Sequence, residues 1–282
     1  MRLIDTHAHL NLPAFAEDLS EVIERCRDKE VAVINVGTKE STSERAVELA
    51  LAHEEMYAIV GLHPICTVPN SETHDDGKGG TPKAKEGEIF NSAFYRDLIE
   101  KGNGKVVGIG ECGFDYYHTA PDSYSVQEEA FIAQIELANE FNLPLMIHTR
   151  GSKPGEISPT GLSVYEDVYA VLKQYAKVRG NVHFYAGTLE EAKKFFDLGF
   201  TISFTGVVTF AKVYEEIVRA VPLELLHGET DCPYVAPIPY RGQRCEPWMV
   251  EEVYKKIAMI RGEEEEGVRL ALLQNAKRLY KI

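Results

Sequence analysis

Short runs of valine, isoleucine and leucine alternate with amphipathic stretches from one end of the chain to the other. Eight of these runs are nearly continuous in apolarity, as is typical of parallel strands that are covered on both faces. The expected strands are 2–6, 31–36, 57–62, 105–110, 144–148, 181–183, 200–204 and 223–229. The expected helices are 14–29, 41–52, 90–101, 126–141, 162–178, 189–198, 211–220, 247–261 and 263–280. This alternation predicts an α/β fold, a (β/α)8 TIM barrel, with a doubly wound open sheet as the alternative.

Length and local signals agree with one barrel. The chain has 282 residues, and a barrel of about 250 residues with insertions is a single domain. We therefore expect one domain over residues 1–282. Two polar, glycine-rich segments, about 69–87 and 151–161, lack periodicity and are expected as loop insertions at the mouth of the active site. They either shape the choice of substrate or are merely tolerated.

Two helix starts carry the spacing of a capping box, in which a hydroxyl and an acid three residues later satisfy each other's backbone N–H groups. The pairs are Ser125 with Glu128 and Thr188 with Glu191. Both pairs support the helices that are expected to begin there.

Charge and composition restrict the function classes. The formal net charge of −14 argues against a broad, sequence-independent grip on duplex DNA, which needs a basic surface. It leaves room for an enzyme that acts on one phosphate, because bound cations supply positive charge locally. No apolar run approaches the roughly 20 residues that span a membrane, and the N-terminus has no signal-peptide pattern. We expect a cytoplasmic protein with no membrane partner and no obligate protein partner.

Six histidines and acids lie at the ends of separate expected strands. They are His7 and His9 in IDTHAHL, Glu111 in GIGECG, His148 in LPLMIHTR, His183 in NVHFYAG and Asp231 in GETDCPY. A lone histidine on an apolar strand is usually a satisfied core residue. Six such residues at the strand ends of a barrel instead predict one shared site, because these ends meet on the face that carries the chemistry. Imidazole nitrogens and carboxylate oxygens suit divalent metals, and such metals suit hydrolysis.

Further residues are expected to assist this metal centre. Asp231 is assigned to the metal and to orienting the nucleophilic water, and Glu229 to fixing a ligand imidazole, with exchanged roles as the alternative. His63 in GLHP is expected to hold the scissile phosphate or assist the leaving group, unless it is a structural histidine before a proline turn. Arg150 and Arg241 are expected to contact substrate oxygens, with surface salt bridges as the alternative.

The motifs, taken together, resemble those of the TatD-type metal-dependent deoxyribonucleases of the amidohydrolase-like barrel superfamily. The matching blocks run almost from end to end: IDTHAHL, GLHP, GIGECGFDYY, LPLMIHTR, VHFYAG, GFTISFTG, ETDCPYVAPIPYRGQRCEP and QNAKRLYKI. VHFYAG differs from the HCFSG that is usual in the family, and GFDYY differs from GLDYY, but neither departure removes a candidate ligand.

The resemblance implies a two-metal centre, with the ligands distributed by position. His7 and His9 would hold one metal with Asp231 alongside, Glu111 would bridge, and His148 with His183 would hold the second. The family's activity is hydrolysis of DNA phosphodiester bonds with Mg²⁺ or Mn²⁺, often as an exonuclease. Zn²⁺ or Ni²⁺ can occupy such sites.

The expected function is therefore a deoxyribonuclease that uses two metals, with Asp231, Glu111, His63 and Glu229 as its catalytic residues and single-stranded DNA ends as its substrate. The same barrel and ligands also serve amidohydrolases that cleave a small C–N, ester or lactone substrate, and the acidic composition favours a small substrate. A third hypothesis is a non-catalytic barrel that retains metal for stability or partner binding.

Overall fold

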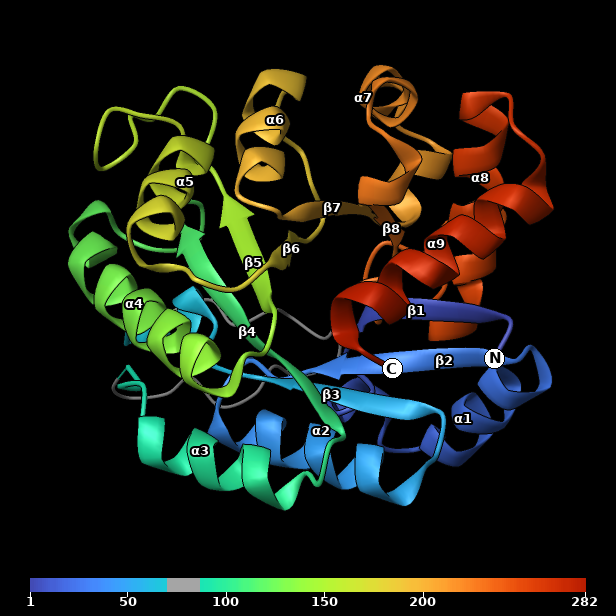
Figure 1. The fold of residues 1–282 in the computed structure, drawn as a ribbon, viewed down its shortest axis with the longest axis horizontal. Helices are drawn as coiled ribbons and strands as arrows, with labels where there is room; N and C mark the ends of the chain where they lie inside the picture. Colours follow the sequence, from blue (N-terminus) through green and yellow to red (C-terminus); the bar gives the residue numbers. More distant parts are fainter. Residues whose placement is uncertain (70–86) are drawn as a thin grey trace.

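Eight parallel strands wind into a barrel that is surrounded by helices (Figure 1). The computed structural model describes residues 1–69 and 87–282. The strands are β1 (Leu3–Ala8), β2 (Val31–Val36), β3 (Met56–Val60), β4 (Val106–Asp115), β5 (Leu145–Arg150), β6 (Gly180–Val182), β7 (Thr201–Phe204) and β8 (Leu226–Gly228). Each strand pairs with the next in sequence order. A parallel bridge between Ala8 and Cys232 returns the chain beyond β8 to β1, so the barrel is nearly closed. This confirms the predicted TIM barrel over the open sheet.

The helices follow the strands as the alternation predicts. They are α1 (Leu19–Asp28), α2 (Glu40–Ala52), α3 (Ser92–Lys101), α4 (Tyr124–Phe141), α5 (Val164–Tyr175), α6 (Leu189–Asp197), α7 (Glu215–Ala220), α8 (Val250–Arg261) and α9 (Glu265–Tyr280). Short 3-10 turns are η1 (Pro13–Phe15), η2 (Pro64–Thr67), η3 (Pro121–Ser123), η4 (Gly206–Thr209), η5 (Lys212–Tyr214), η6 (Leu223–Leu225) and η7 (Pro247–Met249). None of the helices within the described ranges is long and apolar enough to cross a membrane.

One strand extends beyond its predicted end, and this matters for the site. The sequence predicts that the fourth strand stops at Gly110, whereas β4 continues to Asp115 and contains Glu111. Gly110 and Gly113 have φ angles of 145° and 139°, and a Cβ at Gly113 would lie 2.1 Å from the carbonyl oxygen of His148. These glycines let β4 run close to β5 over its whole length.

Helix boundaries confirm one capping box and correct the other. The Thr188 side chain accepts from the Glu191 N–H at 3.2 Å, and Glu191 Oε2 accepts from the Thr188 N–H at 2.8 Å. The prediction of a capping box from Ser125 to Glu128 is wrong, because α4 already begins at Tyr124. A 3-10 turn over Pro121–Ser123 leads into this helix instead of a side-chain cap.

The last helix, α9, closes the barrel at the end opposite to the site. Leu273, Ala276 and Tyr280 of α9 share a buried cluster with residues of β1 to β5. These strand residues are Ile4, Ala32, Ile34, Val36, Ile59, Val107 and Met146. The strands therefore enclose an apolar filling at one end, which leaves the other end for polar chemistry.

The two predicted insertions have different outcomes. Residues 70–86 of the segment at 69–87 lie outside the described residues. The segment at 151–161 falls between β5 and α5, in a stretch without helix or strand that reaches Ser163. This second segment forms part of the wall of the cavity described below.

Candidate metal centre

The six predicted ligand residues come together in one cluster at the C-terminal mouth of the barrel. His7 lies in β1 with His9 directly after it, Glu111 lies in β4, His148 lies in β5, His183 follows β6 and Asp231 follows β8. Five of them are nearly inaccessible, with exposures of 0% for His7, 3% for His9, 2% for Glu111, 8% for His148 and 4% for His183. Buried imidazoles and carboxylates are costly unless they are satisfied, so their convergence needs a partner or an ion.

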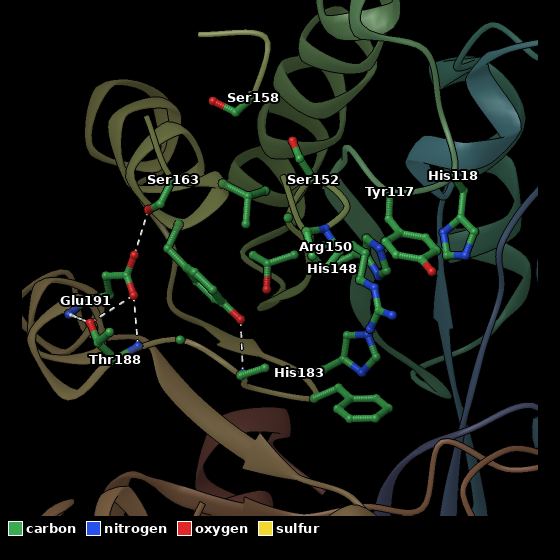
Figure 2. Close-up of a pocket in the computed structure, with 18 of the residues that line it drawn as sticks. Tyr117, His118, His148, Arg150, Ser152, Ser158, Ser163, His183, Thr188 and Glu191 are labelled. Atoms are coloured by element: carbon green, nitrogen blue, oxygen red, sulfur yellow. Dashed lines mark hydrogen bonds between the residues drawn. The ribbon is translucent and has the colours of Figure 1, made fainter. Parts of the chain in front are cut away.

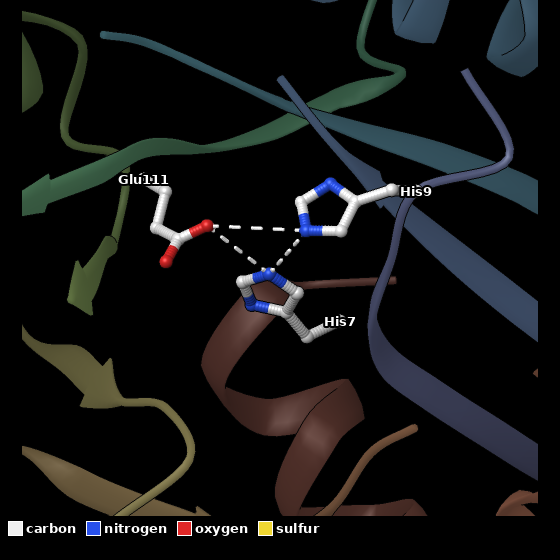
Figure 3. Close-up of side chains that lie close together, drawn as sticks. All are labelled: His7, His9 and Glu111. Atoms are coloured by element: carbon white, nitrogen blue, oxygen red, sulfur yellow. Dashed lines mark hydrogen bonds and ion pairs between the residues drawn. The ribbon is translucent and has the colours of Figure 1, made fainter. Parts of the chain in front are cut away.

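The carboxylate of Glu111 lies between two groups of histidines. Its Oε2 atom is 3.3 Å from His7 Nε2 and 4.0 Å from His9 Nε2. Figure 3 shows these three side chains facing one another. Its Oε1 atom is 2.7 Å from both His148 Nδ1 and His183 Nε2. One carboxylate thus presents an oxygen to each group, which is the arrangement that lets a carboxylate bridge two cations.

Asp231 completes the first group. Its Oδ1 atom lies 3.4 Å from His9 Nε2 and 3.8 Å from His7 Nε2, and these two nitrogens are 3.1 Å apart. The backbone holds Asp231 in a left-handed conformation with φ of 57°, and its N–H donates to the carbonyl oxygen of His7 at 2.9 Å. The position of this carboxylate is therefore tied directly to the strand that carries the two histidines.

Acceptors on the far side of two imidazoles determine which ring nitrogen faces the cluster, whereas His183 Nδ1 lies 3.4 Å from Glu229 Oε1 without a hydrogen bond among the described residues. The two pairs are His9 Nδ1 with Val36 O at 2.8 Å and His148 Nε2 with Asp115 Oδ2 at 3.0 Å. A carbonyl or carboxylate oxygen only accepts, so the outer nitrogen of each neutral ring carries the proton. The inner nitrogen keeps its lone pair for a metal.

Asp115 is a functional candidate that the sequence analysis missed. It is 0% exposed, and besides His148 it contacts His118 Nδ1 at 2.9 Å. Its Oδ1 atom accepts from the backbone N–H groups of Tyr117 and His118 at 2.9 and 2.8 Å. The motif GFDYY shows an acid soon after Glu111, but the imidazole that it meets depends on the pairing of β4 with β5.

Asp5 is a second missed acid, and it joins the two ends of the barrel sheet. Its Oδ1 atom accepts from the backbone N–H groups of Thr230 at 2.8 Å and His7 at 3.3 Å, and its Oδ2 atom accepts from Thr230 Oγ1 at 2.5 Å. Burial raises the pKa of Asp5 well above its ordinary value despite these hydrogen bonds. The contacts fix the chain on either side of His7 and Asp231.

His63 lies beside the second group, but its hydrogen bonds differ from those of the other rings. Its Nδ1 atom accepts from the backbone N–H of Ile65 at 3.1 Å, so the proton of the neutral ring is on Nε2. That Nε2 atom lies 3.2 Å from His148 Nδ1 and 3.5 Å from Glu111 Oε1. Burial, together with the nearby His148, lowers the pKa of His63 to about 4, which keeps the ring neutral. His63 therefore presents an N–H donor, not a lone pair.

The carboxylates of the cluster stay ionised although burial opposes this. Burial alone would raise the pKa of Glu111, but the nearby imidazoles, that of His183 foremost, and the hydrogen bond with His148 outweigh it and hold the pKa well below its ordinary value. The pKa of Asp231 is likewise lowered, because the hydrogen bond with His9 and the nearby imidazoles outweigh burial. Two anionic carboxylates thus lie among the five imidazole rings of His7, His9, His63, His148 and His183 within one buried site.

The neighbouring histidines titrate in the complementary direction. Burial lowers the pKa of His183 and His148, but the carboxylate of Glu111 for His183, and that of Asp115 for His148, outweigh burial and raise both pKa values. The raised pKa values favour protons on the ring nitrogens that face the cluster. Cation binding must displace such protons.

The donor atoms fit divalent metal ions. Among the residues that the structure describes, three groups have ligand atoms that lie within 4.8 Å of one another: His7 with His9 and Glu111, His7 with His183 and Glu229, and His63 with Glu111 and His148. Nitrogen and oxygen donors with fixed tautomers and ionised carboxylates match the preferences of Zn²⁺, Mn²⁺ and Ni²⁺, and the carboxylates also suit Mg²⁺. The buried clusters are those of a binuclear metal site, and they leave the identity of the metal open.

The cluster opens into a cavity of about 1270 Å³. Of the two arginines that were predicted to contact substrate, Arg150 lines this cavity, with its guanidinium carbon 4.9 Å from the centre of the Tyr117 ring. Arg241 instead stacks on Phe210 at 4.0 Å and donates to the carbonyl oxygen of Ala236 at 3.1 Å. Arg241 is not among the lining residues that the described ranges contribute.

A nearly closed parallel barrel with histidines and carboxylates gathered at its strand ends defines a TIM-barrel metal-dependent hydrolase. The chain belongs to the TatD-related DNase family, whose sequence model, "TatD related DNase", matches residues 4–281. This confirms the resemblance drawn from the motifs.

Individual relatives align over nearly their whole length. The chain is 35% identical over 285 residues to the uncharacterized metal-dependent hydrolase YabD of Bacillus subtilis, covering 99% of both proteins. It is 30% identical over 290 residues to the uncharacterized metal-dependent hydrolase YcfH of Escherichia coli, covering 100% of this chain and 97% of YcfH. The crystal structure of YjjV, a TatD homologue of Escherichia coli, matches with a TM-score of 0.80 at 26% identity, covering 100% of this chain and 98% of YjjV.

Proposed function

We propose that this metal-dependent hydrolase cleaves DNA phosphodiester bonds with two divalent cations, Mg²⁺ or Mn²⁺ in preference to Zn²⁺ or Ni²⁺. The observation that carries the proposal is the Glu111 carboxylate, which presents one oxygen to each of two histidine groups at 2.7 to 4.0 Å. When bound, the two cations would supply an activated water and neutralise charge on the phosphoryl oxygens. His7, His9 and Asp231 would hold one cation, His148 and His183 the other, and Glu111 both.

Asp231 is the residue that would receive the proton of the attacking water. Its carboxylate is held below its ordinary pKa, so it is ionised and can accept a proton at Oδ1. It is also the most accessible of the six ligand candidates, with a side-chain exposure of 13% beside the cavity. Glu229, at 0% exposure, would act indirectly by orienting the His183 ring.

Two residues are candidates to contact the phosphate. The Nε2 atom of His63 lies 3.5 Å from Glu111 Oε1, but this ring is 1% exposed and is not among the described lining residues of the cavity, so it would hold a phosphoryl or departing oxygen only if the substrate reaches past Glu111. Arg150 offers a guanidinium fork within the cavity. Arg241 lies farther out on the Phe210 ring, so its role in substrate binding would require a substrate that extends beyond the cavity.

The depth of the centre favours single-stranded ends over duplex DNA. The ligand side chains are almost fully buried below the cavity, and a stacked base pair cannot bring its backbone to such a depth without unstacking. The family's description as a DNase supports DNA as the substrate. The proposal also includes that the enzyme is an exonuclease, that it works in the cytoplasm and that it needs no obligate protein partner.

A small-molecule amidohydrolase is the second candidate, because the cavity and the net charge of −14 also suit a small substrate. A panel of single-stranded DNA, a lactone and a dihydropyrimidine, each with added Mg²⁺, Mn²⁺ or Zn²⁺, separates the two. Hydrolysis of DNA alone supports the proposal, and hydrolysis of the lactone or dihydropyrimidine alone overturns it.

Substitution Asp231→Asn tests the mechanism. The amide keeps the size of the side chain but cannot accept the proton, so turnover should fall to background while the melting temperature and circular dichroism remain those of a folded barrel. Full activity of this variant would remove Asp231 from the mechanism. If the variant does not fold, the melting curve will show it, and the result will mean that the Asp231 side chain is needed for the structure next to His7.

A further inference from the structure

The cavity is larger than the reaction centre requires, and it extends away from the metal ligands. Figure 2 shows His148, His183, Tyr117 and Arg150 at one end, with Ser163, Thr188 and Glu191 at the other. We call this second end the hydroxyl arm and define it by Glu156, Ser158, Leu162, Ser163, Thr188 and Glu191. The whole cavity, which includes the arm and the reaction centre, has a volume of about 1270 Å³. This volume exceeds the range of about 300–1,000 Å³ that is typical of small-ligand sites.

The segment between β5 and α5 builds much of the hydroxyl arm. Ser158 Oγ donates to the carbonyl oxygen of Leu162 at 2.5 Å, and Ser163 Oγ donates to Glu191 Oε1 at 2.6 Å. This second bond ties the segment to the start of α6. Hydrogen bonds thus fix the arm, which is formed by the β5–α5 segment and the start of α6. The arm includes residues of the segment 151–161, which was predicted as an insertion.

The chemistry of the hydroxyl arm is neutral to acidic. Among the described residues that line the whole cavity, Arg150 is the only lysine or arginine, and Figure 2 shows it at the end with the histidines. The arm itself carries the carboxylates of Glu156 and Glu191. A phosphate group in the arm would face these acids without a cation, which is unfavourable.

The arm also combines hydroxyls with exposed apolar side chains. Leu162 is 56% exposed and the neighbouring Ile157 is 82% exposed, although both line the cavity. Exposed apolar side chains in a concave site favour a flat or apolar ligand. The hydroxyl protons of Ser158, Ser163 and Thr188 are used within the arm, so the hydroxyl and carboxylate oxygens favour a ligand that donates from hydroxyl or N–H groups. A sugar joined to a heterocyclic base has both properties and no charge.

We propose that the hydroxyl arm binds the terminal, phosphate-free nucleoside of the substrate, while Arg150 and the metal centre hold the adjoining phosphodiester. The inference rests on the proposed function and adds the end group that the enzyme selects. A strand would enter with a free hydroxyl terminus in the arm, and a terminal phosphate there would be rejected by Glu156 and Glu191.

The first test compares dinucleotides that differ only at their ends. The substrates are thymidylyl-thymidine with two hydroxyl ends, its 5′-phosphorylated form and its 3′-phosphorylated form. One of the two phosphorylated forms should lose at least about tenfold in kcat/KM, because its phosphate must enter the arm, whereas the other should not. Equal kcat/KM for all three substrates would overturn the proposal.

Two variants with matched controls locate the effect. Leu162→Trp should fill the arm and raise KM for thymidylyl-thymidine at least about tenfold, while hydrolysis of bis(p-nitrophenyl) phosphate, which has no nucleoside, stays unchanged. Met259→Trp, at a residue of 75% exposure on α8, is the control for an added surface indole. Glu156→Lys should reduce the discrimination against the rejected terminal phosphate, whereas Glu264→Lys, with the same change in net charge at the start of α9, should not.

A binding measurement separates this proposal from the proposed function. In EDTA, saturation-transfer NMR should detect thymidine on the wild-type protein and on Met259→Trp, but not on Leu162→Trp. Thymidine binding without hydrolysis of any phosphodiester under Mg²⁺, Mn²⁺ or Zn²⁺ would support the arm as a nucleoside site and overturn the proposed chemistry. Hydrolysis of DNA with unchanged thymidine binding in Leu162→Trp would overturn the arm and keep the chemistry.

Discussion

Single side chains at this centre differ in how far the sequence could predict them. The six ligand candidates follow from a simple rule, because they end apolar runs and the ends of barrel strands converge. Asp115 does not follow from that rule, since its importance comes from the far nitrogen of the His148 ring. The proton position on His63 also lies beyond the sequence, because it depends on a backbone N–H two residues away. The residue types therefore predict which side chains can bind a metal, whereas the tautomer of each histidine depends on contacts that form only in the folded protein.

His63 provides a test of this distinction at the residue scale. If Nε2–H is a donor, His63→Gln should keep the full metal content of the wild type and lower kcat by roughly 10²–10³-fold, as for loss of one transition-state donor. His148→Gln, in the same cluster, should lose metal. Elemental analysis of both dialysed variants checks the prediction, and loss of metal from His63→Gln would make it a ligand.

Asp115 should act on metal affinity through the His148 ring. Asp115→Asn weakens the acceptor on His148 Nε2, so metal affinity should fall roughly 10–100-fold. Asp167→Asn is the matched control, because Asp167 is also buried and accepts from Tyr116 and Thr160, and none of its hydrogen-bond partners among the described residues is a histidine. Competition titrations with a chromophoric chelator measure both affinities, and equal values would contradict the role. Nitrogen-15 NMR of the imidazoles would additionally report the tautomer of His148.

At the scale of elements, periodicity predicted existence and order better than boundaries. The strand expected at 223–229 becomes η6 followed by the short β8, because Pro222 precedes a tight turn. The helix expected at 14–29 splits into η1 and α1, with Pro13 at the first turn. These ends depend on proline geometry and on neighbouring strands, neither of which changes the 3.6-residue period. The role of α9 in closing the barrel was likewise invisible, because an amphipathic pattern does not say which surface it covers.

The closure by α9 predicts a clear difference between two leucines of one helix. Leu273 is 5% exposed in the cluster with the strand residues, whereas Leu270 is 45% exposed. Leu273→Ala should reduce the free energy of unfolding by about 2–5 kcal/mol because it leaves a cavity, whereas Leu270→Ala should cost less than about 1 kcal/mol. Urea unfolding of the metal-free proteins gives both values. Similar losses would mean that α9 does not seal the barrel.

At the scale of the whole molecule, the metal centre couples stability to pH in two opposite ways. The pKa values of His9, His148 and His183 are raised in the metal-free fold because carboxylates outweigh burial. Raised pKa values stabilise the fold below about pH 6.5, the ordinary histidine value, and this stabilisation is lost as the pH rises through the raised values. A bound cation needs deprotonated rings, so the stabilisation of the fold by the cation increases as the pH rises.

The measurable consequence is a pH-dependent effect of metal on the melting temperature. The increase caused by saturating Mn²⁺ should be small near about pH 6 and larger near about pH 8, because fewer protons have to be displaced. His227 provides an internal contrast, because burial lowers its pKa to about 3 and its stabilising effect is lost as the pH falls below about 6.5, with or without metal. An increase that does not vary with pH would contradict proton displacement at the centre.

Because most of the ligand side chains are buried, the metal content of a preparation should depend on how the protein was produced. With His7 at 0% and Glu111 at 2% exposure, a cation that enters while the chain folds would exchange slowly with the medium afterwards. Donor sets of nitrogen and oxygen bind several first-row metals in the Irving–Williams order, so abundance during synthesis decides the content more than later dialysis does. Catalytic differences between batches would then reflect the growth medium, and unfolding and refolding in a defined metal buffer would erase them.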